Sequence, residues 1–200
     1  MSKAAARTHF RTLRRQLDPD RRRREMDAIT AALFEWLGDD GEGRTLTCVL
    51  SYGAEPPTGG LLEQLHHRGH RVLVPICEPE RRLSWADWYP GVPMARATVA
   101  PIDEPVGERH PVSVMEEVDV VLVPAQAVDT AGGRIGQGGG YYDRFIASLG
   151  TLQRRPVLLA MVFEHELVPP GTFEVGPLDQ PVDGILTAAG ITWTAEALEP

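Results

Sequence analysis

The sequence predicts an α/β fold: a single three-layer α/β/α domain over residues 1–200 with a mainly parallel sheet. Short apolar runs typical of buried strands, at 45–51, 71–77, 118–124 and 156–163, alternate with segments of helical periodicity. A strand, a helix and a second strand in this order form a right-handed βαβ unit, which makes the strands parallel and covers the sheet with helices. A chain of 200 residues has the length of one domain.

The chain is expected to open with two helices. Residues 3–17 contain alanines and leucines, which have high helix propensity. Asp18-Pro19-Asp20 should end that helix and begin the next, because Asp and Pro are favoured at helix starts. In the second segment, 20–37, apolar residues recur at helical spacing, which predicts a face buried against the sheet.

Further elements are expected along the rest of the chain. Helices at 58–68 and 141–149 each follow a strand, and a final strand should begin at Asp183. The Pro-rich stretch 90–110 reads as irregular, and stretches of that length are uncommon unless they pack over a functional site. The aromatic residues just before it, Trp85, Trp88 and Tyr89, either stack on a ligand or pack under a loop.

The composition is that of an ordinary globular protein. Hydrophobic residues make up 42% of the chain and charged residues 24%, and no apolar run reaches the length that spans a membrane, about 18 residues. No apolar segment of the signal-peptide kind follows the start. Cys48 and Cys77 lie in strand-like apolar runs and are expected as buried thiols. We therefore expect a cytoplasmic protein without a membrane partner.

Charge is distributed unevenly along the chain. The net charge is −8, yet residues 1–24 carry nine Lys or Arg and only two Asp. This arm could bind nucleic acid, but the acidic remainder of the chain is unfavourable for a broad basic surface. The favoured interpretation is a helix that directs cations at a bound anion. Lys3 and Arg7 are spaced four residues apart and therefore share one face of that helix.

The stretch that organises the chain is Arg134–Phe145, which follows the apolar run 118–124 and precedes a predicted helix. The order strand, glycine-rich turn, helix presents backbone amides to a phosphate. Without side chains, the glycines would let a nucleotide approach the main chain closely. They are Gly136, Gly138, Gly139 and Gly140. Glycine clusters also form mobile loops, so the glycines alone do not define a site.

The residues around the glycines strengthen the functional interpretation. Gln137 can donate two hydrogen bonds without carrying a charge, and Tyr141 and Tyr142 add two rings. Asp143 places a hard oxygen ligand beside the cation Arg144. Such a carboxylate can hold Mg2+ against phosphate oxygens, because this ion prefers one or two carboxylates together with phosphate and water.

The segment around the glycines resembles the signature of a known family. Residues 129–144 read DTAGGRIGQGGGYYDR, which is similar to the signature of the 5-formyltetrahydrofolate cyclo-ligases, also called methenyltetrahydrofolate synthetases. The family pattern is close to D-x-x-G-x-R-[LI]-G-x-G-x-G-Y-Y-D-R, and every fixed position of it is met. The family also opens with a K-x-x-x-R pair, which Lys3 and Arg7 match.

The resemblance implies an enzyme with a Rossmann-like, nucleotide-binding sheet. Its reaction would be the ATP- and Mg2+-dependent cyclisation of 5-formyltetrahydrofolate to 5,10-methenyltetrahydrofolate, with release of ADP and phosphate, through phosphorylation of the formyl oxygen. 5-Formyltetrahydrofolate and ATP would then be the partners and Mg2+ the cofactor. We expect a monomer or a weak dimer that binds no nucleic acid.

The resemblance also implies individual site residues. The expected ATP-binding residues are Lys3, Arg7, Arg134, Gly136, Gln137, Gly138, Gly139, Gly140, Tyr141 and Tyr142. The expected folate-binding residues are Tyr52, Glu55, Gln137, Gly138, Gly139, Gly140 and Tyr141. Asp143 and Asp179 would bind Mg2+, Tyr141 and Tyr142 would border the reacting centre as catalytic residues, and Arg144 would orient the loop.

Two positions depart from the family pattern. Pro57 stands where many cyclo-ligases carry an acidic residue, so either Glu55 takes over that contact or the pterin is held differently. Leu178 stands where the family often has His. These departures keep open a non-catalytic ATP- or folate-binding protein, and the Arg-rich start keeps open a nucleic-acid-binding one.

Overall fold

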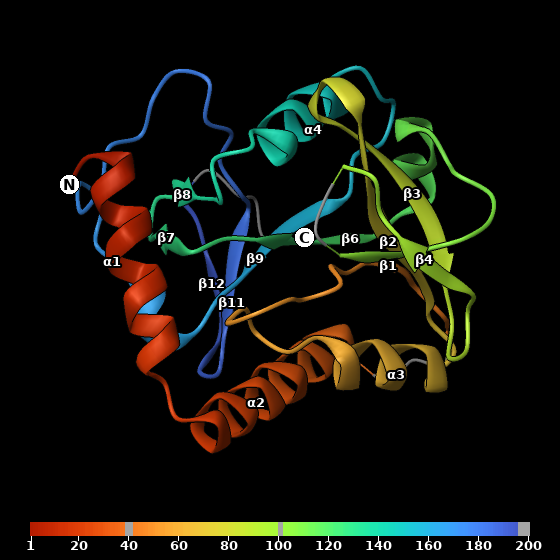
Figure 1. Ribbon diagram of the computed structural model, residues 1–200, viewed down its shortest axis with the longest axis horizontal. Helices are drawn as coiled ribbons and strands as arrows, with labels where there is room; N and C mark the ends of the chain where they lie inside the picture. Colours follow the sequence, from red (N-terminus) through yellow and green to blue (C-terminus); the bar gives the residue numbers. More distant parts are fainter. Residues whose placement is uncertain (39–41, 100–101, 196–200) are drawn as a thin grey trace.

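The computed structural model describes residues 1–38, 42–99 and 102–195. A seven-stranded sheet runs through its centre in the order β12-β11-β9-β6-β1-β2-β3 (Figure 1). Five adjacent strands are parallel, namely β11 (Gly184–Thr187), β9 (Val157–Met161), β6 (Val120–Pro124), β1 (Thr45–Thr47) and β2 (Arg71–Glu78). The edge strands β12 (Gly190–Trp193) and β3 (Arg82–Trp88) are antiparallel to their neighbours. The predicted α/β fold with a mainly parallel sheet is confirmed.

Helices cover both faces of this sheet (Figure 1). The long helix α2 (Pro19–Leu37) and α3 (Gly59–His67) lie on one face. The helix α4 (Tyr141–Leu149) and the 3-10 helix η2 (Val112–Glu117) lie on the other. The three layers that the sequence predicts are therefore present, and the bounds of α4 are the predicted ones.

The strands bury side chains on both faces because successive residues of a strand point in opposite directions. In β6, Val120 and Leu122 pack with α2 and α3, whereas Val121 and Val123 pack with α4 and η2. All four are essentially buried. This is why the strands read as continuous apolar runs in the sequence rather than as an alternation of polar and apolar residues.

The helix α1 (Lys3–Gln16) belongs to neither layer and packs at one end of the molecule (Figure 1). It lies against a second sheet, formed by β10 (Leu167–Val168), β7 (Ala127–Asp129) and β8 (Arg134–Ile135). Ala6 and Phe10 of α1 form a small core with Ala127, Ile135 and Phe173. The sequence does not predict this sheet, because strands of two or three residues are too short to show a periodic pattern of apolar residues.

The remaining differences from the predicted elements are local. Strand β1 ends at Thr47, four residues before the predicted run ends, and the stretch expected to be irregular contains a hairpin of β4 (Met94–Arg96) and β5 (Asp103–Pro105). Two short 3-10 helices, η1 (Pro79–Arg81) and η3 (Glu164–Glu166), were also not predicted. Within the described residues, no helix is long and apolar enough to cross a bilayer.

A buried ion pair ties α1 to the rest of the fold. The Arg14 guanidinium donates to both carboxylate oxygens of Glu166, with 2.8 Å between Nη2 and Oε2, and to the carbonyl oxygen of Ala125 at 2.5 Å. The Arg14 side chain is 4% exposed and that of Glu166 is fully buried. Burial raises the pKa of the Glu166 carboxyl, and Arg14 opposes that rise. Without Arg14, an uncompensated charge would be left inside the protein.

We therefore expect Arg14→Met to reduce the free energy of unfolding by about 3–5 kcal/mol, the cost of breaking a buried ion pair by removing one partner. Urea unfolding followed by circular dichroism measures this loss. Arg15→Met is the matched control, because Arg15 is exposed on the same helix. Similar losses in the two variants would contradict the buried-pair interpretation.

Candidate active site

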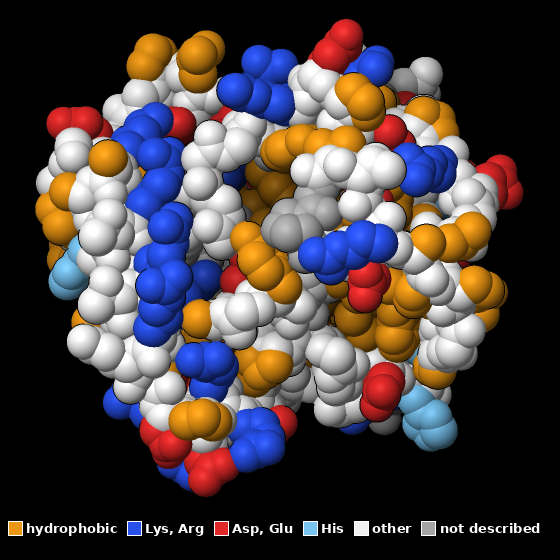
Figure 2. Space-filling view, viewed as in Figure 1, with side chains coloured by type: hydrophobic (Ala, Val, Ile, Leu, Met, Phe, Trp, Pro, Cys, Tyr) orange, Lys and Arg blue, Asp and Glu red, His pale blue; other side chains and the backbone are white. Residues whose placement is uncertain are grey.

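A cavity of about 660 Å³ opens at the carboxyl edge of the sheet, beside the ends of β1 and β6. From β1 the chain continues to β2 on one side and later reaches β6 on the other, so the direction of winding reverses between these strands. Open α/β sheets bind ligands at such switch points. Figure 2 shows Lys and Arg side chains in a column over α1, next to a hollow with hydrophobic side chains at its base.

The two walls of the cavity differ in chemistry. The wall formed by β2, β3 and the loops after β1 and β4 is mostly apolar. Its lining residues include Leu50, Tyr52, Pro75, Cys77, Leu83, Val99 and Ile102. The opposite wall, formed by α1, β8 and the start of α4, carries charges and the glycine loop. A ligand that fills the cavity is therefore expected to have a flat apolar part and an anionic part.

Cations from α1 reach the charged wall. The ammonium group of Lys3 pairs with Asp179, with 2.6 Å between Nζ and Oδ1, and the Gly176 amide donates to Asp179 Oδ2 at 2.6 Å. Burial alone would raise the pKa of the Asp179 carboxyl, but the Gly176 amide and Lys3 hold this pKa below its ordinary value. Arg7 donates from Nε to the Gly136 carbonyl oxygen at 3.0 Å. The structure thus brings Arg7 to the predicted glycine loop and Lys3 to Asp179, and both cations line the same cavity.

The glycine loop joins β8 directly to α4 and lines the cavity. Gly138 has φ 98° and Gly140 has φ 72°, a left-handed backbone that strongly favours glycine. A side chain at Gly139 would meet the ring of Tyr141, because an added Cβ would lie 2.9 Å from its Cδ2. The first amides of α4 lack intrahelical partners, and the helix dipole makes this end positive. Together they form a place where an anion can bind.

Arg134 and Asp143 connect the two ends of this loop. Arg134 Nη2 donates to Asp143 Oδ1 at 2.7 Å, and the Gln180 amide donates to the same oxygen at 3.2 Å. The Arg134 side chain is only 3% exposed. Burial lowers the pKa of the Arg134 guanidinium, and Asp143 counteracts this. Arg134 therefore shapes the loop as well as lining the cavity.

The two predicted metal ligands, Asp143 and Asp179, line the same cavity. Within the described part of the chain, no group of three or more His, Cys, Asp or Glu is placed to hold a metal ion. Two carboxylates nevertheless suit Mg2+, which usually takes one or two of them and completes its shell with phosphate oxygens and water. Asp143 Oδ2 makes no hydrogen bond to the described residues, whereas Asp179 would have to exchange Lys3 for the ion.

A chain of hydrogen bonds links the two walls. Gln126 Nε2 donates to Gln137 Oε1 at 2.8 Å, and Gln137 Nε2 donates to Glu55 Oε1 at 3.1 Å. The other carboxylate oxygen of Glu55 accepts from the Tyr52 amide at 3.2 Å. Glu55 thus reaches the cavity, whereas Pro57 is exposed and does not line it. Gln126 was not predicted, although a polar residue two positions after the end of a buried strand can indicate a site at the edge of the sheet.

The two tyrosines of the motif lie differently. Tyr141 covers Gly139, whereas Tyr142 points inward and packs edge to face on Phe145, with ring centroids 6.0 Å apart. Burial raises the pKa of Tyr142 well above its ordinary value, and the nearby thiols of Cys48 and Cys77 add to this. At neutral pH the Tyr142 hydroxyl is therefore a hydrogen-bond donor and not a base. Trp85 is fully buried in the core, so it does not stack on a ligand.

Three polar atoms of the cavity residues are buried without a hydrogen-bond partner among the described residues. They are Gln126 Oε1, Arg134 Nε and Tyr142 Oη. Unpaired buried polar atoms are rare because each costs about 1–3 kcal/mol. Further atoms of this kind lie outside the cavity lining, on Arg22, Thr47, Trp85 and His165, but these three belong to residues that border the space a ligand would fill.

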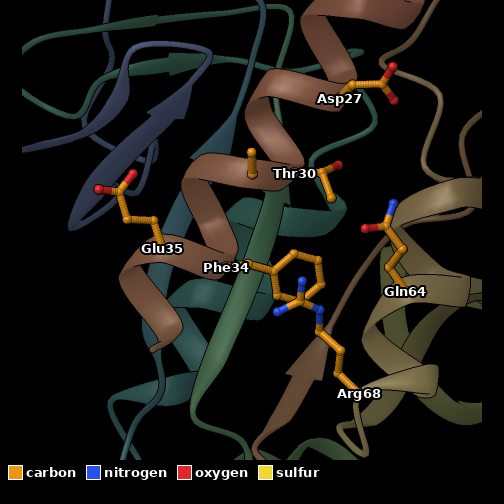
Figure 3. A pocket seen from close by; sticks show the side chains of 7 residues that line it. Asp27, Thr30, Phe34, Glu35, Gln64 and Arg68 are labelled. Carbon is orange, nitrogen blue, oxygen red and sulfur yellow. The ribbon is translucent and has the colours of Figure 1, made fainter. Parts of the chain in front are cut away.

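A second cavity lies between α2 and α3, away from the glycine loop (Figure 3). The guanidinium of Arg68 lies over the ring of Phe34, 4.0 Å from its centroid, while Asp27 and Gln64 line the other end. None of its lining residues has a buried polar atom without a partner within the described ranges. This groove therefore lacks the feature that distinguishes the first cavity.

A parallel sheet with a switch-point cavity, a glycine loop at a helix start and converging cations defines an α/β protein with a site suited to an anionic ligand at the switch point of its sheet. More specifically, the chain belongs to the 5-formyltetrahydrofolate cyclo-ligase family, whose model matches residues 1–188. The resemblance seen in the motif is thus confirmed over nearly the whole chain.

Individual relatives agree with this family. A 5-formyltetrahydrofolate cyclo-ligase of Mycolicibacterium smegmatis is 32% identical over 84% of this chain and 84% of its own length. That of Escherichia coli is 29% identical over 74% of this chain and 81% of its own length.

Solved structures show the same fold. The 5,10-methenyltetrahydrofolate synthetase of Aquifex aeolicus matches with a TM-score of 0.74 at 23% identity, covering 99% of this chain and 95% of its own. The synthetase of Mycoplasma pneumoniae matches with a TM-score of 0.73 at 18% identity, covering 94% of this chain and 99% of its own.

The burial of the Tyr142 hydroxyl can be tested directly. In the folded protein, Tyr142→Phe should leave the ultraviolet phenolate titration unchanged through about pH 10, where a free tyrosine ionises. In denaturant the same substitution should remove one ionising phenol, which serves as the control. Loss of a phenolate signal near pH 10 in the folded variant would show that Tyr142 is accessible.

Proposed function

We propose that this protein is a 5-formyltetrahydrofolate cyclo-ligase that uses ATP and Mg2+ to form 5,10-methenyltetrahydrofolate, ADP and phosphate. The observation that carries the proposal is that one cavity has both a wall suited to binding anions and an apolar wall. Membership of the family and the names of the relatives supply the substrate class. As part of the same proposal, residues 1–200 act as one unit in the cytoplasm, as a monomer or weak dimer without nucleic-acid or membrane partners.

ATP would place its phosphates at the charged wall. Lys3 and Arg7 supply two cations there, and the glycine loop with the start of α4 supplies backbone amides. Asp143 and Asp179 would hold Mg2+, which neutralises charge on phosphate oxygens when it is bound. Lys3 would then leave Asp179 and turn to a phosphate.

The folate would place its pterin ring on the apolar wall beside Leu50 and Tyr52. The amino-pyrimidinone edge of a pterin donates hydrogen bonds, and Glu55 is an acceptor within the cavity. Gln137 and Gln126 fix the position of Glu55 through the hydrogen-bond chain that joins the walls. Glu55 would in this way replace the acidic contact absent at Pro57.

The reaction would proceed in two balanced steps. The formyl oxygen attacks the γ-phosphorus of ATP, ADP leaves, and a phosphorylated iminium forms at N5. N10 then attacks the formyl carbon, the C–O bond breaks, phosphate leaves with that oxygen, and loss of the N10 proton gives the methenyl product. Such steps depend on positioning and on charge neutralisation, which the cations, the loop amides and the neutral hydroxyl of Tyr142 would supply.

The direct test follows the absorbance of the methenyl product with purified protein, 5-formyltetrahydrofolate, ATP and Mg2+. We expect a rise that requires all three additions. A flat trace with intact binding of ATP and folate would instead identify a non-catalytic binding protein.

The role of Asp143 is best tested with Asp143→Asn, since Asp143→Ala would remove the ion-pair partner of the buried Arg134. The substitution should cost ~3 kcal/mol of transition-state stabilisation, a fall of about 100-fold in turnover at saturating Mg2+. Turnover equal to that of the unmodified protein would show that Asp143 does not have the proposed role in binding Mg2+. Urea unfolding of the variant checks that its fold is retained.

The glycine loop can be tested with a matched pair of alanine substitutions. Gly138 and Gly171 both have positive φ, 98° and 82°, so alanine at either position strains the backbone by about 1 kcal/mol. Only at Gly138 would the new Cβ occupy space in the cavity lining, in van der Waals contact with the Arg7 guanidinium 3.4 Å away, whereas at Gly171 it meets open space. We expect weaker ATP binding by calorimetry in Gly138→Ala alone. Equal ATP affinity in the two variants would contradict the proposed phosphate site.

A further inference from the structure

Two adjacent residues in the turn between β2 and β3 have an unusual backbone. Glu80 has φ 61° and Arg81 has φ 59°, and they are the non-glycine residues with positive φ in the described part of the chain. Each such residue costs on the order of 1–3 kcal/mol and persists only where its surroundings enforce it. The turn η1 therefore holds strain that the rest of the structure must stabilise.

Arg144 supplies part of that stabilisation. Its Nη1 donates to the carbonyl oxygen of Glu80 at 3.1 Å, and η1 lies beside α4 in Figure 1. Arg144 is the last residue of the motif that forms the glycine loop, so the same helix carries the loop and fixes this turn. Arg144 was expected to orient the glycine loop, but its side chain instead contacts the β2–β3 turn.

The residue that the turn presents to the cavity is Arg81. It lines the cavity together with Leu83, Val99 and Ile102, on the apolar wall. The other cations that line the cavity are on the charged wall, and each has a partner there. Among the described residues, the Arg81 guanidinium makes neither a hydrogen bond nor an ion pair. A strained turn thus places a cation without a partner among the described residues at the outer part of a mostly apolar wall.

We propose that Arg81 binds a carboxylate at the glutamate end of the folate substrate and that Arg144 positions it. This inference rests on the proposed function. A folate has a flat ring system at one end and carboxylates at the other. If its pterin lies on the apolar wall, its carboxylates extend toward the exposed rim of the cavity. A guanidinium pairs with a carboxylate through two parallel hydrogen bonds. Arg81 is the cation on that wall.

The test compares two ligands, 5-formyltetrahydrofolate and the neutral methylamide of 5-formyltetrahydropteroate (called the pteroate below), which lacks the glutamate and carries no carboxylate. Arg81→Ala should raise KM for the folate by roughly 10-fold, a typical effect of a lost hydrogen bond to a charged group. Its kcat and its KM for ATP should stay unchanged. For the pteroate, Arg81→Ala and the unmodified protein should give the same KM.

Arg82→Ala is the matched control, because Arg82 is the adjacent cation, is 69% exposed and does not line the cavity. Arg144→Gln should reproduce part of the Arg81→Ala effect on the folate only, and should add nothing in the Arg81→Ala background. An equal effect of Arg81→Ala on both ligands, or no effect on either, would overturn the proposal.

The outcome can be separated from failure of the proposed function. If the unmodified protein turns over neither ligand, calorimetric binding of the same two ligands replaces KM. Tighter binding of the folate than of the pteroate, abolished by Arg81→Ala, would then support Arg81 without catalysis. Absence of folate binding to the unmodified protein would overturn both proposals.

Discussion

The docking of α1 is the interaction on which the rest of the site depends. Lys3, Arg7 and Arg14 project from one helix and reach Asp179, the Gly136 carbonyl and Glu166, all in the second half of the chain. All three cations line the cavity, and Arg14 also anchors the helix inside the protein. Without this contact the glycine loop would keep its backbone but lose the cations that face it.

The cavity combines two chemistries because it lies where the sheet changes its direction of winding. The apolar wall comes from strands on one side of that point, and the charged wall comes from elements on the other side, with Gln126, Gln137 and Glu55 linking them. The core around it is ordinary, with apolar side chains on both sheet faces. At the site, Gln126, Arg134 and Tyr142 each have a buried polar atom without a hydrogen-bond partner among the described residues.

Much of this arrangement could be predicted from the sequence. The parallel strands appear as apolar runs, and the motif from Arg134 to Arg144 fixes the position of the loop. The partners of the cations could not be predicted, because Lys3 and Asp179 are separated by 176 positions and no pattern links them. The left-handed backbone at Arg81 could not be predicted either, because this hairpin turn has none of the Gly, Asn or Asp residues that usually occupy such positions. The small sheet beside α1 could not be predicted, because its strands are too short to show a periodic pattern of apolar residues.

The most direct test of the account is calorimetric titration of Mg-ATP into the double variant Lys3→Met/Arg7→Met. The control is Arg11→Met/Arg15→Met, which removes the same charge from exposed positions of the same helix. We expect the first pair to weaken ATP binding by about 100-fold or more, since each lost charged hydrogen bond costs ~1.5–3 kcal/mol. The control pair should leave the affinity nearly unchanged. Equal affinities of the two double variants would show that the docked face of α1 is not the phosphate-binding wall.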